Sequence, residues 1–225
     1  MEKLVEAVSD PRTHRYSTSR GIKGLRKAVA GYYGSRFGVE LDVETEVIVT
    51  LGSKEGLANL ASAISAPGDV VLVPNPSYPI HPYGFVIAGA NVCPVRVGDG
   101  LDLMAEIKSA ALKVSPRPKA LVLNFPNNPT GAVVDLDFYS EVVEFARSIG
   151  MYILSDIAYA EIYFDGRPPP SILQVRGAMD IAVEFSSVSK TYSMPGWRVG
   201  FGAGNKDLIG ALARIKSYLD YGAFT

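Results

Sequence analysis

The chain has 225 residues, of which 48% are hydrophobic and 20% charged, and its formal net charge is −1. This balance is typical of a folded globular protein, and it gives no basic surface field for nucleic acid. No apolar run approaches the roughly 18 residues of a membrane span, and the N-terminal sequence lacks a signal-peptide core. The single cysteine, Cys93, excludes an internal disulfide and fits a reducing compartment, so we expect a cytoplasmic protein.

Apolar runs alternate with helical patterns along the chain. Strands are predicted over residues 46–50, 70–73, 92–97, 119–125, 151–154, 181–185 and 199–203. Helices are predicted over residues 53–66, 102–113, 135–149 and 207–219. Near-continuous apolar strands interleaved with helices indicate an α/β fold, a three-layer αβα sandwich with a mostly parallel sheet covered on both faces.

Polar and aromatic residues follow several of these strands at the point where each strand ends. They are, in chain order, Ser53, Lys54, Tyr78, Asn128, Asp156, Tyr159, Ser187 and Lys190. Ligands of such sheets bind beyond the carboxyl ends of the strands. We therefore expect these side chains to converge at one edge of the sheet.

A lysine and a carboxylate are the most telling residues in this set. Lys190 is expected either to be salt-bridged or to act as an amine nucleophile. Burying the carboxylate of Asp156 costs desolvation free energy unless a cation or a hydrogen-bond donor contacts it. Ser53 alone predicts a helix cap, although a bare helix N-terminus is also an anion site. Residues 127–131 alone predict a turn, and Arg198 alone predicts a surface arginine.

Other familiar binding and catalytic motifs are incomplete or absent in the sequence. The glycine-rich segment 200–204 suggests a dinucleotide loop, but the required third glycine falls on Asn205, after the last strand. His14, His81 and Cys93 have no metal-ligand spacing, so we expect no metal site. Neither a Gly-Lys-Ser/Thr phosphate loop nor a Gly-x-Ser-x-Gly hydrolase motif is present.

A lysine nucleophile, a carboxylate, an anion-binding helix end and a stacking aromatic residue together suit pyridoxal 5′-phosphate. The motifs Asn-Asn-Pro-Thr-Gly (127–131), Ser-Asp-x-x-Tyr (155–159) and Ser-x-Ser-Lys with a later Gly-x-Arg (187–198) occur in this order. They closely resemble the motifs of the class I/II, fold type I pyridoxal-phosphate aminotransferases. Residues 16–26 resemble the N-terminal motif of that family, and the resemblance covers essentially the whole chain.

The resemblance implies a catalytic role for Lys190, Asp156 and Tyr159. Lys190 would bind the cofactor aldehyde and later move a proton between substrate and cofactor, and Asp156 would pair with the ring nitrogen. Asn128 and Tyr159 would hydrogen-bond the phenolic oxygen of the ring, and Tyr78 would lie against the ring face.

The resemblance also implies a phosphate-binding set and a partner. The phosphate would be held by Ser53, the backbone of Lys54, Ser187 and Arg198. Tyr16 would reach the phosphate of the neighbouring subunit, which implies a homodimer with shared sites. The small-molecule partners would be an amino acid and a 2-oxo acid, with neither nucleic acid nor a membrane.

The substrate is less sharply defined. Residues 14–22 are similar to a branch with bacterial alanine transaminases and LL-diaminopimelate aminotransferase-like enzymes. This favours alanine and 2-oxoglutarate, with aspartate, methionine and aromatic amino acids left open. A carbon–sulfur lyase on the same fold, or a non-catalytic pyridoxal-phosphate-binding regulatory domain, is the alternative function.

The resemblance has a consequence for domain organisation. Family members carry an N-terminal arm and a C-terminal small domain outside the matched segment, and the small domain supplies the arginine that binds the substrate carboxylate. Residues 1–225 are therefore expected to form an incomplete pyridoxal-phosphate-binding large domain, with weak cofactor binding and negligible transamination by itself.

Overall fold

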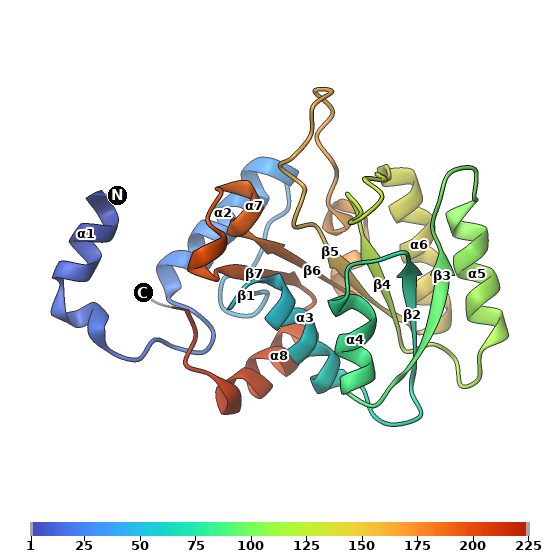
Figure 1. Ribbon diagram of the computed structural model, residues 1–225, viewed down its shortest axis with the longest axis horizontal. Coiled ribbons are helices and arrows are strands. Elements are labelled where there is room, and N and C mark those ends of the chain that lie inside the picture. The colour runs from blue at the N-terminus through green and yellow to red at the C-terminus, as the bar shows by residue number, and fades with distance from the viewer. Residues whose placement is uncertain (1, 224–225) are drawn as a thin grey trace.

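The computed structural model describes residues 2–223; Met1, Phe224 and Thr225, the ends of the predicted domain, lie outside the described residues. A seven-stranded sheet forms the middle of three layers, in the order β1-β7-β6-β5-β4-β2-β3 (Figure 1). The strands are β1 (Val47–Thr50), β2 (Val70–Asn75), β3 (Asn91–Arg96), β4 (Ala120–Asn124), β5 (Tyr152–Asp156), β6 (Ala182–Ser187) and β7 (Gly200–Gly204). Because only the pairings of β7 with β1 and β6 are antiparallel, the predicted α/β fold with a mostly parallel sheet is confirmed.

Helices cover both faces of the sheet. They are α1 (Glu2–Ser9), α2 (Lys23–Phe37), α3 (Ser53–Ile64), α4 (Ile80–Ile87), α5 (Leu103–Lys113), α6 (Leu136–Ile149), α7 (Val188–Thr191) and α8 (Lys206–Leu219). Short 3₁₀ turns are η1 (Pro11–His14), η2 (Ile172–Gln174), η3 (Ala178–Asp180) and η4 (Pro195–Trp197). Side chains of α2, α5 and α6 pack on one face, and those of α3, α4 and α8 pack on the other.

Alternate residues of the central strands feed the two apolar cores. Leu72 and Leu121 join the core under α2, α5 and α6, whereas their neighbours Val71 and Val122 join the core under α3, α4 and α8. Successive side chains of a strand point to opposite faces. Since both faces are covered by helices, both sets are apolar, which is why these strands are continuous apolar runs.

The predicted elements lacked four helices, α1, α2, α4 and α7, of which α2 and α4 pack on the sheet. Helix α2 contains three glycines, yet it buries Val29, Tyr33 and Phe37, which form one stripe along the helix. Helix α4 lies in a proline- and tyrosine-rich segment, with Pro82 in its first turn. A proline is tolerated there because the first backbone N–H groups of a helix have no intrahelical partner.

The glycine-rich segment 200–204 is strand β7, not a dinucleotide loop. A Cβ atom on Gly200 would lie 2.6 Å from the backbone of Gly52 and Ser53, and one on Gly202 would lie 3.1 Å from the ring of Phe185. The glycines therefore allow β7 to lie directly beneath the start of α3.

The N-terminal helix α1 stands away from the body, to which an extended segment connects it (Figure 1). None of its residues is buried. Among residues 2–223, no helix combines the length and the apolar character that crossing a membrane requires.

Candidate active site

A pocket of about 150 Å³ opens at the carboxyl edge of the sheet. Every predicted site residue except Tyr16 lines it, so the expected convergence is found. The pocket has four further lining residues that were not among the predicted site residues: Asn124, Ala158, Ser189 and Pro195. Arg198 reaches this edge because it precedes β7, whose antiparallel direction places its first residue beside the last residues of β1 and β6.

Asp156 is the last residue of β5, and its side chain is only 6% exposed. Its Oδ1 accepts a hydrogen bond of 3.0 Å from the backbone N–H of Ala158, and its Oδ2 lies 3.0 Å from Nε2 of His81. His81 is fully buried in the first turn of α4. These two groups are the donors that the sequence predicted for a buried carboxylate at this position.

Sequence reasoning missed His81, which had been considered only as a metal ligand. No spacing in the sequence relates residue 81 to residue 156, since they lie on different elements 75 positions apart. Nδ1 of His81 has no hydrogen-bond partner within the described part of the chain.

Asn124 connects the end of β4 to its surroundings. Its Nδ2 donates a hydrogen bond of 3.0 Å to the carbonyl of Asp156, and its Oδ1 accepts one of 2.9 Å from the N–H of Asn128. Asn127 closes the following turn by accepting hydrogen bonds from the N–H and hydroxyl of Thr130. Residues 127–131 thus form the predicted turn, and the turn holds Asn128 at the pocket.

Lys190 lies on α7, a single turn of helix directly after β6. Oγ of Ser187 caps this turn by accepting a hydrogen bond of 3.2 Å from the N–H of Ser189. Within residues 2–223, Lys190 forms no ion pair, so the salt-bridged alternative is wrong for this part of the chain. Its Nζ lies 5.7 Å from the ring centroid of Tyr159.

The start of α3 lies at the pocket, which Ser53 and Lys54 line. The N-cap residue Gly52 provides no side-chain hydrogen bond, so the first N–H groups of the helix are left without a side-chain cap. Arg198, with φ of 52°, places its guanidinium against this turn and donates to the carbonyls of Pro195 and Leu51. A Cβ atom on Gly52 would lie 2.4 Å from Nη2 of Arg198. Arg198 therefore belongs to the pocket and is not an isolated surface arginine.

Tyr16 lies outside the pocket of its own chain. It is 83% exposed, and its ring packs against Tyr221 with a centroid distance of 4.5 Å. Its predicted contact with the phosphate of a neighbouring subunit stays a prediction.

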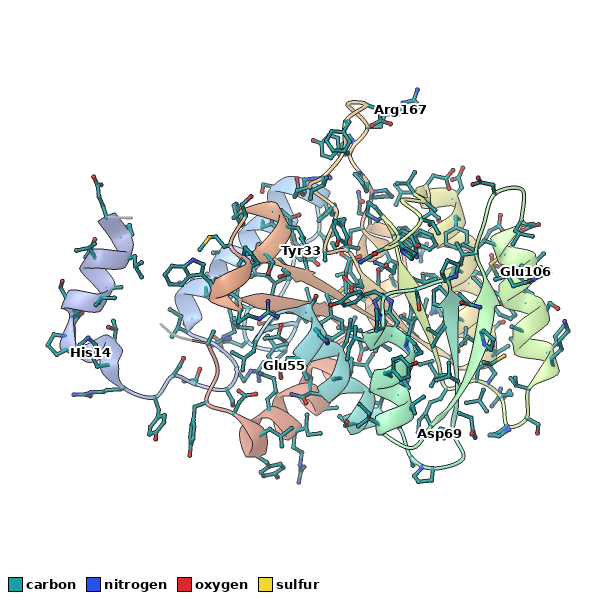
Figure 2. The ribbon with its side chains drawn as sticks, viewed as in Figure 1. His14, Tyr33, Glu55, Asp69, Glu106 and Arg167 are labelled. Atoms are coloured by element: carbon teal, nitrogen blue, oxygen red, sulfur yellow. The ribbon has the colours of Figure 1, made fainter. Side chains whose placement is uncertain are left out.

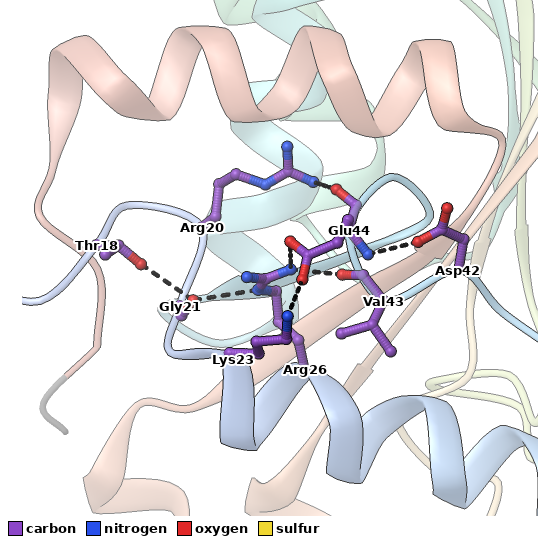
Figure 3. Close-up of polar contacts among 8 residues, drawn as sticks. All are labelled: Thr18, Arg20, Gly21, Lys23, Arg26, Asp42, Val43 and Glu44. Carbon is purple, nitrogen blue, oxygen red and sulfur yellow. Dashed lines mark hydrogen bonds and ion pairs between the residues drawn. The ribbon is translucent and has the colours of Figure 1, made fainter.

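The segment after Tyr16 is fixed to the body by the polar contacts in Figure 3. Arg26 donates to the carbonyl of Val43 and pairs with Glu44, which also pairs with Lys23. Gly21 has φ of 82°, and a Cβ atom there would lie 2.3 Å from Val49 of β1. These contacts explain the arginines, the lysine and the first glycine of the motif over residues 16–26.

The sequence was compared with models of protein families. The model described as "Aminotransferase class I and II" matches residues 1–219. The chain belongs to the class I and II aminotransferase family. The resemblance inferred from the three motifs is therefore confirmed.

Curated relatives match the chain over its full length. It is 58% identical to the putative aminotransferase AatC of Rhizobium meliloti and covers 56% of that protein. It is 54% identical to the glutamate-pyruvate aminotransferase AlaC of Escherichia coli (55% covered) and 47% identical to an LL-diaminopimelate aminotransferase of Desulforudis audaxviator (57% covered). The chain thus spans just over half the length of these aminotransferases, and an incomplete large domain over residues 1–225 stays a prediction.

Solved aminotransferase structures share the fold. The chain superposes on BacF of Bacillus subtilis with a TM-score of 0.89 at 35% identity, over 99% of the chain and 56% of BacF. It superposes on N-succinyldiaminopimelate aminotransferase of Mycobacterium tuberculosis with a TM-score of 0.91 at 30% identity, over 99% of the chain and 58% of that enzyme. The fold is that of the fold type I aminotransferases.

Proposed function

We propose that the protein is a pyridoxal 5′-phosphate-dependent aminotransferase that exchanges an amino group between alanine and 2-oxoglutarate. One observation carries the proposal: a single pocket combines the lysine amine of Lys190, the buried carboxylate of Asp156 and an uncapped helix N-terminus beside Arg198. The family and the names of the relatives support the reaction class.

The residues of the pocket fit this cofactor group by group. Its phosphate requires anion-binding donors, which the start of α3, Ser187 and Arg198 would provide. Its ring nitrogen stays protonated beside a carboxylate, which Asp156 would provide. Its aldehyde requires an amine, which Lys190 would provide. When bound, pyridoxal phosphate would supply an electron sink for the bond that breaks at the substrate Cα.

The chain's own residues would perform the remaining tasks. The Ala158 N–H and His81 fix both oxygens of Asp156, so that its charge is held in one orientation. The amine of Lys190 would hold and move a proton, because it forms no ion pair with a carboxylate among the described residues. Asn128, Tyr159 and Tyr78 would orient the ring.

The substrates and the assembly rest on similarity. The name of the Escherichia coli relative supports alanine (whose oxo acid is pyruvate) and 2-oxoglutarate (the oxo acid of glutamate), and other relatives are named for LL-diaminopimelate. The proposal includes a homodimer in the cytoplasm, with Tyr16 serving the partner's site. None of these comparisons favours the lyase or the regulatory alternative.

Covalent labelling tests the cofactor proposal. Pyridoxal phosphate is added to the protein, the adduct is reduced with borohydride, and the labelled peptide is mapped. We expect the phosphopyridoxyl group on Lys190, and we expect Lys190→Ala to abolish labelling. Lys54→Ala is the matched control, because Lys54 lines the same pocket and should leave labelling of Lys190 intact. A label on Lys54, or none, would contradict the proposal.

Product analysis tests the substrate. Incubation of the full-length enzyme with alanine and 2-oxoglutarate should give pyruvate and glutamate in equal amounts, faster than LL-diaminopimelate and 2-oxoglutarate give glutamate. Release of ammonia or a thiol without a new amino acid would instead indicate a lyase.

A further inference from the structure

A fully buried lysine lies outside the pocket. Lys216 of α8 is 0% exposed, and its Nζ lies 3.0 Å from Oε1 of Glu55 and 2.8 Å from Oδ2 of Asp220. Lysine is almost never fully buried unless it is paired. Neither Lys216 nor Glu55 lines the pocket, so the proposed chemistry does not use this ion pair directly.

Glu55 connects the ion pair to the start of α3. Its Oε2 accepts a hydrogen bond of 2.8 Å from the backbone N–H of Leu51, and its Oε1 accepts hydrogen bonds from Lys216 and Asn59. The carbonyl of Leu51, in turn, accepts a hydrogen bond of 3.5 Å from Arg198. Glu55, which does not line the pocket, therefore holds the turn from which α3 begins at the pocket.

This turn has little freedom to move. On one side a Cβ atom at Gly200 would meet the backbone of Gly52 and Ser53 at 2.6 Å, and on the other the guanidinium of Arg198 approaches Gly52. Groups that stabilise an anion through oriented N–H dipoles depend on their position, and a displacement of about 1 Å is costly. Losing the Glu55–Leu51 hydrogen bond would remove one of the contacts that hold these N–H groups in place.

The charge of Glu55 needs compensation. A carboxylate near a helix N-terminus occupies the field that a bound phosphate would use. Lys216 lies out of contact with water between Glu55 and Asp220, so its poorly screened charge offsets part of the negative charge of both carboxylates. Without Lys216, Glu55 would be a largely buried carboxylate facing the anion site.

We propose that Glu55 and Lys216 are positioning residues for a phosphate group bound at the N-terminus of α3. Glu55 fixes the turn at Leu51, and Lys216 offsets the charge with which Glu55 would oppose the phosphate. The inference rests on the proposed function only in taking the phosphate to be that of pyridoxal phosphate.

The test compares pyridoxal phosphate with its two parts, pyridoxal and inorganic phosphate. Dissociation constants for pyridoxal phosphate, pyridoxal and inorganic phosphate are measured by fluorescence or calorimetry. Two double variants, Glu55→Gln/Lys216→Met and Glu55→Ala/Lys216→Met, carry the same charge and differ in the acceptor offered to Leu51. Lys216→Met alone tests the charge.

A matched control lies at the amino ends of β2 and β4, at the edge of the sheet opposite the pocket. Asp69 pairs with Lys119 at 2.7 Å and accepts a hydrogen bond of 2.8 Å from the backbone N–H of Ala66, as Glu55 does from Leu51. Figure 2 shows Glu55 and Asp69 well apart. Asp69→Ala/Lys119→Met therefore removes a comparable ion pair and turn contact, and it should leave the preference for phosphorylated ligands unchanged.

The Glu55→Gln/Lys216→Met variant should bind pyridoxal phosphate and inorganic phosphate within about twofold of the unsubstituted protein, because its glutamine still offers an acceptor to the N–H of Leu51. The Ala/Met variant should lose about tenfold on both, as expected for one hydrogen bond, and less than about twofold on pyridoxal. Lys216→Met alone should weaken both phosphate ligands; if it does not fold, the two double variants decide.

Equal affinities in the two double variants, or equal losses for pyridoxal and its phosphate, would overturn the inference. Failure of the proposed function looks different. The unsubstituted protein would then carry no label on Lys190, while the inorganic phosphate measurements would still decide the role of Glu55.

Discussion

Two buried carboxylates on neighbouring strands show how position in the sheet changes what the same chemical group does. Asp156 ends β5 at the pocket, whereas Glu184 lies inside β6, opposite Ser155 of β5. Asp156 keeps a face toward the pocket, and its partners are His81 and a backbone N–H. Glu184 is 0% exposed and lies on the side of the sheet covered by α2.

Glu184 is surrounded by four hydrogen-bond donors from α2, β5 and the start of η2. Its carboxylate accepts hydrogen bonds from Ser171 at 2.6 Å, Tyr33 at 3.0 Å, the N–H of Ile172 at 3.2 Å and Ser155 at 3.4 Å. Burial raises the pKa of Glu184 to about 7, and these hydrogen bonds oppose that rise. No ligand reaches this group through the pocket described above, so its role is to join α2, β5, β6 and η2.

The difference teaches that a buried carboxylate becomes a binding group only at the end of its strand. There the backbone turns away, and one side of the carboxylate is left to a ligand. In the strand interior the protein itself must satisfy all of the acceptor positions. The following predictions test this division.

The largest effect is expected at Asp156. Asp156→Asn keeps an acceptor for the Ala158 N–H but loses the charge and the acceptor that faces His81, and Asp156→Ala loses both acceptors and the charge. Each should lower the transamination rate of the full-length enzyme by about a hundredfold or more, because a charged partner at low dielectric contributes several kcal/mol. Steady-state rates measure the effect, with circular dichroism as the control for folding. Turnover within about threefold of the unsubstituted protein would refute it.

At Glu184 the expected effect is on stability and not on catalysis. The folded pKa of about 7 exceeds the ordinary 4.5, so the folded state binds a proton more tightly than the unfolded state. This contribution is complete below about pH 4.5 and is lost as the pH rises through about 7, so the free energy of unfolding should fall by up to about 3 kcal/mol across that window.

Urea denaturation between pH 4.5 and 8.5 measures this dependence. Glu184→Gln should flatten it, whereas Glu141→Gln, an exposed position on α6, should leave it unchanged. A Glu184→Gln variant with the original pH slope would show that another group is responsible.

The smallest effect is expected at His81. His81→Leu removes one donor from Asp156 and leaves its backbone hydrogen bond. We expect the rate to fall about tenfold, near the contribution of one hydrogen bond to a charged group. The other histidine, His14, is exposed and bonds the carbonyl of Val8, so His14→Leu is the control and should have no effect. Equal rates in the two variants would mean that Asp156 needs no support from α4.

Most of the sheet could be predicted because its strands are buried on both faces and are therefore apolar without interruption. Helices α2 and α4 could not, since glycines and prolines hide them and packing against the sheet stabilises them. The pocket followed from the rule on strand ends, and the motifs supplied its chemistry.

By itself the sequence determined the class of fold, the motifs of the family and the residues at the strand ends, because these depend on local pattern and chain order. Only the tertiary structure decided that His81 meets Asp156, that Lys216 meets Glu55 and that Glu184 meets Tyr33. Each of these contacts joins elements at least 75 residues apart. No sequence spacing encodes such a contact, because the folding of the intervening chain alone brings its two residues together.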